Sequence, residues 1–183
     1  VTLPQLWRNI TSTVMVTSGV DDCSVCYTNK ANVNRLLQVL QQEYQCSTDW
    51  TGARYIGLTL AWDYIAGTCD ISMPGYIDRA LNPFAHPKPT QQEHAPHPWK
   101  APVYGARQQF TQHDDAPFVD AKDKKLLQEI LGTLLYYAQA IDGTMIEAIR
   151  TIPTQQATPT TTTMADITQL LNYCATHPDA VVR

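Results

Sequence analysis

Two adjacent carboxylates, Asp21 and Asp22, are the residues whose types and spacing point most directly to chemistry. The surrounding stretch, 13–27, contains two short β-prone runs, which predicts a β-hairpin with the acid pair at its tip. Such a tip can hold Mg²⁺, which prefers a few carboxylates, several waters and substrate phosphates. Two metal ions held in this way can carry out an in-line phosphoryl transfer. Because Asp is also a common turn residue, a solvated hairpin turn is the alternative interpretation.

Length and composition limit the functions that are open to the chain. Its 183 residues suit one large domain or two small ones, and a hydrophobic content of 44% is enough for a packed core. The net charge of −4 argues against avid, unaided nucleic-acid binding, because phosphate contacts need Lys and Arg. A local stripe of Arg79, Lys88, Lys100 and Arg107, with Glu93 as the only acid among them, is either a basic contact surface or a solvated polar linker.

Targeting and cysteine patterns point to the inside of a cell. The sequence has no run of about 20 apolar residues that would span a membrane, and it does not start with a signal peptide. Its five cysteines, an odd number at irregular spacings, are typical of reduced thiols. The chain starts at Val1 and stops at Val181-Val182-Arg183 without a closing signal, so we expect a piece of a longer polypeptide.

The first 82 residues mix strand and helix patterns. An amphipathic helix is predicted over 31–45, and a strand over 54–62 is followed by a turn and a second strand over 68–72. A short helix is predicted over 74–81, with Pro74 in its first turn. The apolar face expected of the first helix consists of Val33, Leu36, Leu37, Leu40 and Tyr44.

The remainder is a proline-rich connector followed by helices. Residues 83–119 hold seven of the twelve prolines and form the only obvious internal boundary. Helices are predicted over 120–142 and 144–152, and a capping box at Thr163 and Asp166 is expected to open a last helix that ends at His177. This order predicts an α+β fold with domains 1–82, 83–119 and 120–183. The expected apolar faces are Leu127, Ile130, Leu131, Leu134, Ala138 and Ile141, and Met164, Ile167, Leu170, Leu171 and Cys174.

Two further groups of residues have metal-ligating types. Cys23 and Cys26 have a redox or metal spacing, but residues three apart on a strand point to opposite faces, so we do not expect them to chelate one ion. His86, Glu93, His94 and His97 include a spacing usable for zinc. The prolines around them favour a connector with solvated histidines.

Four short motifs follow one another along the chain: Leu6-Trp7-Arg8 with the strand into Val20-Asp21-Asp22, Tyr55-Ile56-Gly57-Leu58, Ser72-Met73-Pro74-Gly75-Tyr76-Ile77, and Leu131-Gly132-Thr133-Leu134-Leu135-Tyr136. In this order and spacing they resemble the reverse transcriptase of copia-type retrotransposons, over nearly the whole chain. They are similar, in turn, to that family's palm hairpin with its Tyr/Val-Val-Asp-Asp motif, its Tyr-Leu-Gly-Met strand, its Ser-Gln-Pro-Gly-Tyr-Ile helix start and its Val-Gly-Ser-Leu-Leu-Tyr helix.

The resemblance implies an RNA-directed DNA polymerase, a nucleotidyltransferase of a transposable element that uses two Mg²⁺ (or Mn²⁺) ions. It implies Asp21 as a main metal ligand and catalytic residue with Asp22 beside it, and a third carboxylate upstream of Val1. Residues 1–82 would be the second half of the palm, and 120–183 a helical thumb that leads towards an RNase H domain. Without the fingers and the third carboxylate, the isolated chain is expected to be inactive.

The same resemblance implies the partners. Residues 54–72 would place the primer end, with Tyr55, Gly57, Leu58 and Trp62 as primer- or template-binding residues. The partners would be an RNA or DNA template-primer, dNTP, and the rest of the Pol polyprotein, namely fingers, RNase H and integrase. No membrane partner is implied, and the location would be a cytoplasmic particle or the nucleus.

One departure from the family concerns Gly19, which stands where a bulky residue usually precedes Val-Asp-Asp. Glycine in a strand loosens it. The return strand Cys23-Ser24-Val25-Cys26 is also unusually polar, and Pro153 and a block of threonines interrupt the expected helical thumb. Together these departures suggest an element that decays without selection and whose activity Gly19→Val or Gly19→Tyr would restore. Two other interpretations stay open: a non-catalytic retroelement remnant or nucleic-acid-binding module, and an intracellular α+β domain whose Asp pair is only a turn.

Overall fold

The computed structural model describes residues 5–9, 14–19, 21–99, 105, 114–152 and 158–183. By their internal contacts the residues form two compact units, 1–71 together with Arg183, and 72–182. Antiparallel strands and α-helices are both present, which confirms the predicted mixed α+β class. The division at 71/72 precedes the boundary that the proline content suggested at 82/83. The assignment of these parts to a polymerase palm and thumb stays a prediction.

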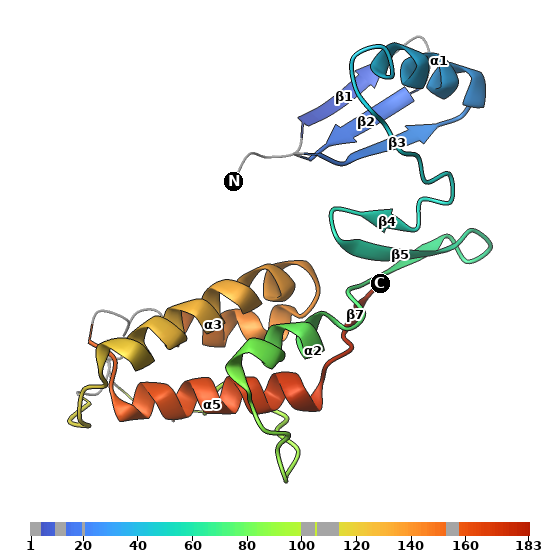
Figure 1. Ribbon diagram of the computed structural model, residues 1–183. Coiled ribbons are helices and arrows are strands. Elements are labelled where there is room, and N and C mark those ends of the chain that lie inside the picture. The colour runs from blue at the N-terminus through green and yellow to red at the C-terminus, as the bar shows by residue number, and fades with distance from the viewer. Residues whose placement is uncertain (1–4, 10–13, 20, 100–104, 106–113, 153–157) are drawn as a thin grey trace. The chain divides into compact units, whose positions relative to one another are not determined.

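A three-stranded antiparallel sheet opens the first unit (Figure 1). Its strands β1 (Gln5–Asn9), β2 (Val14–Ser18) and β3 (Cys23–Tyr27) are neighbours in chain order. Helix α1 (Lys30–Leu40) packs against β3. The predicted hairpin over 13–27 is therefore confirmed, whereas β1, which pairs with β2, was not assigned as a strand from the sequence.

Helix α1 is shorter than the sequence pattern predicted. It begins after Asn29, whose side chain accepts a hydrogen bond from the amide of Ala31 (2.9 Å), and it ends at Leu40 instead of residue 45. Of the expected apolar face, Val33 is buried, but Tyr44 lies beyond the helix and is 67% exposed. Three polar residues, 41–43, follow Leu40. They offer no apolar surface that would stabilise another helical turn by packing.

The second group of strands in this unit contains a turn that the sequence pattern missed. The predicted strand over 54–62 is divided into β4 (Arg54–Tyr55) and β5 (Leu58–Asp63), which pair antiparallel. Between them, Ile56 and Gly57 have φ values of +46° and +81°. Positive φ at both central residues is the pattern of a type I′ hairpin turn. Strand β6 (Thr68–Ser72) lies next to β5, as predicted.

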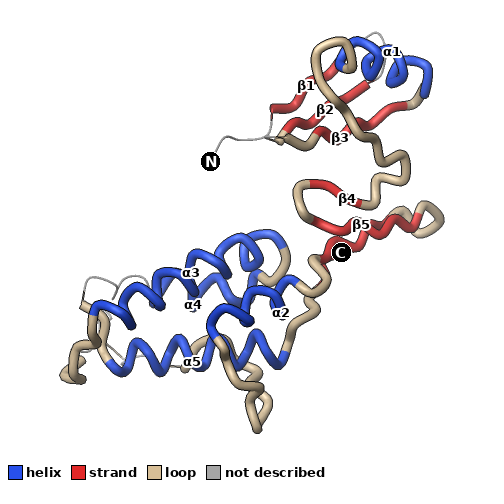
Figure 2. The backbone as a smooth tube through the Cα atoms, viewed as in Figure 1, coloured by secondary structure: helices blue, strands red, loops and turns tan. Residues whose placement is uncertain are grey.

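The second unit is helical (Figure 2). Helix α2 (Tyr76–Leu81) begins two residues later than predicted, because Gly75 before it is left-handed (φ +66°), and a 3-10 turn, η1 (Asn82–Phe84), follows. Helix α3 (Ala121–Ala140) confirms the helix predicted over 120–142. The 3-10 turn η2 (Gly143–Met145) and helix α4 (Ile146–Thr151) occupy the next predicted helix, and α5 (Thr161–Thr176) and the short strand β7 (Val181–Val182) come last.

Helices α2, α3, α4 and α5 enclose the core of this unit. Helix α3 contacts α2, α4 and α5, and α2 also contacts α5. Both predicted apolar faces are largely confirmed as core, because apolar side chains at helical spacing turn towards one another and away from water. The core side chains with at most 1% exposure include Ile77, Leu127, Ile130, Leu134, Tyr137, Met145, Ile152, Ile167, Leu170 and Cys174.

Helix α5 starts with a capping box, three residues earlier than predicted. Its N-cap is Thr160, whose hydroxyl accepts a hydrogen bond from the amide of Thr163, and the Thr163 hydroxyl accepts one from the amide of Thr160. The carboxylate of Asp114 accepts hydrogen bonds from the hydroxyls of Thr160 and Thr162. A threonine thus takes the third helical position that Glu or Gln usually fills, which explains why the Thr163–Asp166 pair was mistaken for the box.

A buried carboxylate ties the end of α3 to α5. Asp142, 6% exposed, accepts hydrogen bonds from the amide and the hydroxyl of Thr144 and from the Tyr173 hydroxyl (3.0 Å). The hydroxyls of Thr144 and Tyr173 also lie 2.8 Å apart. A buried carboxylate with several donors is satisfied, so this network stabilises the helical unit.

Tyr137 in α3 joins three segments of the same unit. Its ring stacks on that of Tyr76 in α2 at 5.4 Å between centroids. Its hydroxyl donates to the carbonyl of Pro178 (3.3 Å) and accepts from the amide of Ala180 (3.1 Å). The segment after α5 is therefore fastened to α3 through a side chain that is itself 1% exposed.

The described part of the proline-rich connector packs along α5. His86 Nε2 lies 2.8 Å from Asn172 Oδ1, the amide of Glu93 donates to Thr176 Oγ1 (3.1 Å), and the Gln169 amide group donates to the carbonyl of Ala95 (3.0 Å). Residues 85–99 contain no helix or strand, yet they belong to the second unit. Among the described residues, no helix combines the length and apolar character needed to cross a membrane.

Candidate functional site

The two carboxylates lie at the tip of the β2–β3 hairpin. Ser18 and Cys23 are the last pair of opposite residues in the two strands, so Gly19, Asp21 and Asp22 belong to the connection. The amide of Gly19 donates to the carbonyl of Asp22 (2.7 Å), which closes a tight turn. Asp21 and Asp22 are both exposed. This arrangement presents the acid pair to solvent on a paired, two-stranded support, as the sequence predicted.

The Asp22 carboxylate makes a long-range contact. Its Oδ2 accepts a hydrogen bond from the backbone amide of Ile56 (3.0 Å), 34 residues further along the chain. Ile56 is the first turn residue between β4 and β5, inside the motif Tyr55-Ile56-Gly57-Leu58. Two motifs that were identified separately in the sequence therefore meet at one hydrogen bond within the first unit.

The Asp21 carboxylate has no hydrogen-bond partner among the described residues of the chain. One oxygen of Asp22 is bound to Ile56, whereas Asp21 is exposed and no such bond to its carboxylate is present. A divalent cation at this tip would find its more available ligand in Asp21.

The turn at Ile56 is strained. A β-branched residue with φ of +46° is an outlier, because its Cβ approaches the neighbouring carbonyl oxygen in the left-handed region. Strain of this kind persists only where other contacts impose it, and it gathers at functional sites. Here the imposed conformation turns the Ile56 amide towards Asp22.

Gly19 permits the close approach of the two hairpins. A Cβ placed on Gly19 would lie 3.1 Å from Ile56 Cγ2 and 3.5 Å from the Asp22 carbonyl oxygen. The first distance is shorter than ordinary van der Waals contact, so a side chain at this position displaces Ile56. Glycine therefore has a steric reason to stand here, and the proposed restoration by Gly19→Val carries a steric cost that the sequence did not reveal.

The four predicted primer- or template-binding residues lie around the β4–β5 hairpin. Tyr55 and Leu58 form its last opposite pair, and both are half-buried. The Tyr55 hydroxyl oxygen is buried and has no hydrogen-bond partner in the described part of the chain. Gly57 is exposed at the turn, and a Cβ there would meet no atom within 4 Å. Their contact with nucleic acid stays a prediction.

Trp62, the fourth of these residues, belongs to an exposed aromatic pair. Its ring nitrogen donates to the carbonyl of Gly52 (2.8 Å), which fixes the indole on β5. The ring stacks on that of Tyr64 with 6.1 Å between centroids and 12° between planes. Trp62 is 48% and Tyr64 82% exposed. An exposed stack of this kind can receive a nucleobase.

The other metal-ligating types in the sequence do not converge. Cys23 and Cys26 are exposed free thiols on β3. His86 bonds to Asn172, and His97 Nδ1 lies 3.0 Å from the carbonyl oxygen of Pro98. Within the described residues, no group of three or more His, Cys, Asp or Glu side chains gathers around a point. An ion at Asp21 and Asp22 would need further ligands from water, substrate phosphates or another carboxylate.

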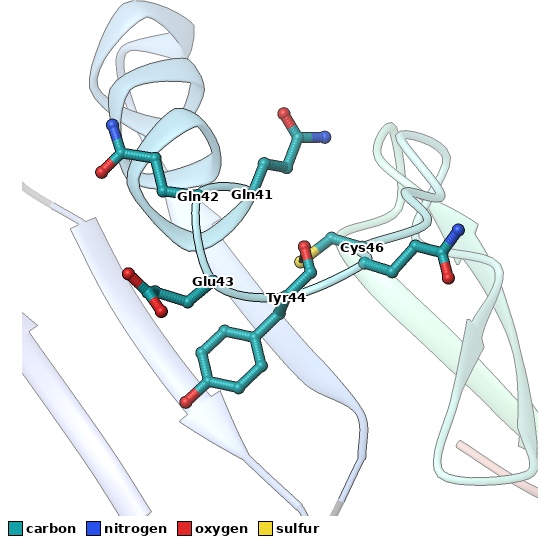
Figure 3. Close-up of a pocket in the computed structure, with 6 residues that line it drawn as sticks. Gln41, Gln42, Glu43, Tyr44 and Cys46 are labelled. Carbon is teal, nitrogen blue, oxygen red and sulfur yellow. Dashed lines mark hydrogen bonds between the residues drawn. The ribbon is translucent and has the colours of Figure 1, made fainter.

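A surface depression lies away from these residues, at the turn after α1 (Figure 3). Figure 3 shows the side chains of Gln41 and Gln42 on one side of the turn and the Tyr44 ring on the other. Six consecutive residues, 41–46, line the depression. It is the hollow of a single polar turn without converging charged or nucleophilic groups, and we assign it no role in binding.

Ile56 is the residue of this candidate site that sequence reasoning did not assign to it. Its contribution is a backbone amide and a left-handed φ, and neither property follows from its side chain.

In comparisons with protein families, curated proteins and solved structures, nothing matches this chain.

Proposed function

We propose that this chain is the part of a copia-type reverse transcriptase, an RNA-directed DNA polymerase, that carries the catalytic Asp hairpin and the adjoining primer hairpin. The observation that supports it best is the contact between the two motifs: Asp22, beside Asp21 at an exposed hairpin tip, accepts a hydrogen bond from Ile56. If the Asp pair were only a solvated turn, a second motif that resembles the same family would have no reason to lie within hydrogen-bond distance of it.

In this proposal Asp21 is the main ligand of the Mg²⁺ pair. Phosphoryl transfer depends chiefly on positioning and charge neutralisation, and two metal ions can stabilise both the attacking and the leaving oxygen. Asp22 contributes one free carboxylate oxygen and, through Ile56, holds the neighbouring hairpin near the metal. A third carboxylate and the fingers, supplied by other parts of the Pol polyprotein, complete the polymerase together with dNTP.

The exposed Trp62–Tyr64 stack provides a surface for the primer end. Aromatic faces accept bases of any sequence, and a template-primer duplex is otherwise held through its backbone. The net charge of −4 leaves the chain few cations for phosphates, so a metal ion between carboxylate and phosphate has to contribute to the attraction. We therefore expect duplex binding that requires Mg²⁺.

The test is a binding titration of a fluorescent RNA–DNA primer-template duplex with the 183-residue chain. Fluorescence anisotropy measures the binding with Mg²⁺ or with EDTA, over a range of salt concentrations. The variants are Asp21→Asn and the double change Asp21→Asn with Asp22→Asn. Asp179→Asn, which removes an exposed carboxylate from the other unit, is the matched control. Thermal unfolding of each variant checks that the fold is retained.

Mg²⁺-dependent, salt-sensitive binding that Asp21→Asn weakens and Asp179→Asn does not would support the proposal. Salt-sensitive binding that neither Mg²⁺ nor Asp21→Asn changes would refute it in favour of a non-catalytic nucleic-acid-binding module. Absence of binding would refute both and leave the Asp pair as a structural turn.

A further inference from the structure

Two histidines that are far apart in the sequence meet in the helical unit. His94 lies in the connector, and His177 is the C-cap residue of α5. His94 Nδ1 is 3.1 Å from His177 Nε2, and the two rings are 5.2 Å apart between centroids with 53° between their planes. The sequence pattern grouped His94 with His86 and His97, and only the fold brings His177 to it.

The separation of the two nitrogens suits a shared metal ion. Two imidazole nitrogens on one tetrahedral Zn²⁺, each about 2.05 Å from the metal, lie about 3.3 Å from one another. The observed 3.1 Å requires little change in distance. What has to change is the direction of the rings, so that both lone pairs point to one place. His94 is exposed and can turn without displacing the core.

The backbone on both sides of His94 is anchored to α5. The preceding residue, Glu93, donates its amide to Thr176 Oγ1 (3.1 Å), and the carbonyl of the following residue, Ala95, accepts from the Gln169 side chain (3.0 Å). These bonds hold the His94 backbone in place before any ion arrives. Preorganisation of this kind lowers the entropic cost of forming a site.

His177 is held by its own neighbours. Its amide donates to the carbonyl of Tyr173 (2.9 Å), and its ring lies 4.9 Å from the Tyr173 ring between centroids. The Tyr173 hydroxyl is in turn fixed by the buried Asp142. The carboxyl end of α5 also carries the negative end of the helix dipole, which favours a cation at this position.

We propose that His94 and His177 form a two-histidine site for a borderline divalent transition-metal ion such as Zn²⁺, which fastens the connector to the end of α5. Imidazole ligands suit Zn²⁺, Cu²⁺ and Ni²⁺, whereas Mg²⁺ prefers oxygen ligands. No third His, Cys, Asp or Glu joins the pair among the described residues. Water fills the remaining positions, so the site is open and its ion exchangeable.

The test is calorimetric titration of Zn²⁺ into the 183-residue chain, with urea unfolding measured with and without the ion. Because Cys23 and Cys26 are exposed thiols, a type of ligand that Zn²⁺ also accepts, the parent protein for all variants carries Cys23→Ser and Cys26→Ser. The variants are His94→Ala and His177→Ala. The matched control is His97→Ala, which alters the same connector but removes a half-buried ring whose Nδ1 lies 3.0 Å from the carbonyl oxygen of Pro98.

We expect the parent to bind one Zn²⁺. The affinity for this ion should fall at least about tenfold in His94→Ala and in His177→Ala, and it should be unchanged in His97→Ala. Zn²⁺ should raise the urea midpoint of the parent and of His97→Ala only, because an ion bound to the folded state stabilises it. Circular dichroism without metal checks the fold. If His177→Ala fails to fold, His94→Ala decides the question, since its side chain is exposed.

Zn²⁺ binding that is equal in all four proteins, or absent in the parent, would overturn the site. Mg²⁺ should produce no change at this pair. The result is independent of the proposed polymerase function, because the histidines belong to the unit 72–182 and the Asp pair to the unit 1–71. Either proposal can fail while the other holds.

Discussion

Replacement of Asp22 should separate its structural role from its role as a metal ligand. Asp22→Ala removes the acceptor of the Ile56 amide. Asp22→Asn removes the charge but leaves a side-chain oxygen that can still accept this bond. Asp21→Ala removes a carboxylate that has no such bond to Ile56. All three changes reduce the negative charge at the hairpin tip, but only Asp22→Ala removes the hydrogen bond to the Ile56 amide.

The size of the effect follows from the hydrogen bond. At 3.0 Å and on an exposed turn, one such bond contributes about 1 kcal/mol net. That free energy corresponds to about a fivefold change in an equilibrium constant. If opening of this contact controls exchange of the Ile56 amide with solvent, Asp22→Ala should accelerate that exchange about fivefold. Asp22→Asn and Asp21→Ala should leave it within about twofold, since both keep an acceptor at position 22.

Amide exchange followed by NMR on the ¹⁵N-labelled chain measures this directly. The Leu60 amide, which donates to the carbonyl of Ala53 (2.8 Å) just before β4, serves as an internal reference that no Asp22 variant should affect. Equal acceleration in Asp22→Ala and Asp21→Ala would refute the reasoning, as would an unchanged Ile56 rate in Asp22→Ala. Mg²⁺ titrated into the same sample should shift the Ile56 amide in the wild type and in Asp22→Asn, but less in Asp21→Ala.

Three further predictions concern stability. Tyr173→Phe should lower the free energy of unfolding by about 1.5–3 kcal/mol in urea, because it removes a hydrogen bond to the buried Asp142 carboxylate. Burial raises the pKa of Cys174 from 9.0 to about 12, so the fold keeps this thiol protonated and loses the corresponding stability as pH rises from about 9 to about 12. Urea midpoints across this range should fall less in Cys174→Ala. Gly57→Ala should cost about 1 kcal/mol through its backbone alone, because a Cβ there meets no atom but φ is +81°. The Ile56 amide exchange should then also accelerate.

Local patterns predicted the elements that depend on neighbours in sequence. The Asp hairpin follows from two β-prone runs around a turn, and α3 from apolar residues at helical spacing with Asp120 as its N-cap. In each case the residues that form the recognisable sequence pattern also form the backbone hydrogen bonds of the element. The presence of α4 and α5 was predicted for the same reason, and so was the burial of residues such as Leu134 and Leu170.

Features that depend on distant partners or on unusual backbone angles were not predictable. The alternation around Tyr55 looks like one strand, because nothing in an Ile-Gly pair announces two left-handed residues in succession. The capping box of α5 has a threonine in the third helical position, where Glu or Gln is usual, so the later Thr163–Asp166 pair matched the expected pattern better. The contacts of Asp22 with Ile56 and of His94 with His177 span 34 and 83 residues, and no pattern local to either partner identifies the other.

The hydrogen bonds of Tyr137 to the segment after α5 have a consequence for the order in which the helical unit forms during synthesis. Helices α2 and α3 leave the ribosome first, and their tyrosine rings can stack as soon as both are present. The Tyr137 hydroxyl, however, receives its partners only when residues 178 and 180 have emerged, about 40 residues later. Until then a polar group that belongs in the core has to remain solvated, because a buried group without a partner costs about 1–3 kcal/mol. The nascent unit should therefore stay loosely packed around Tyr137 until the segment after α5 completes it.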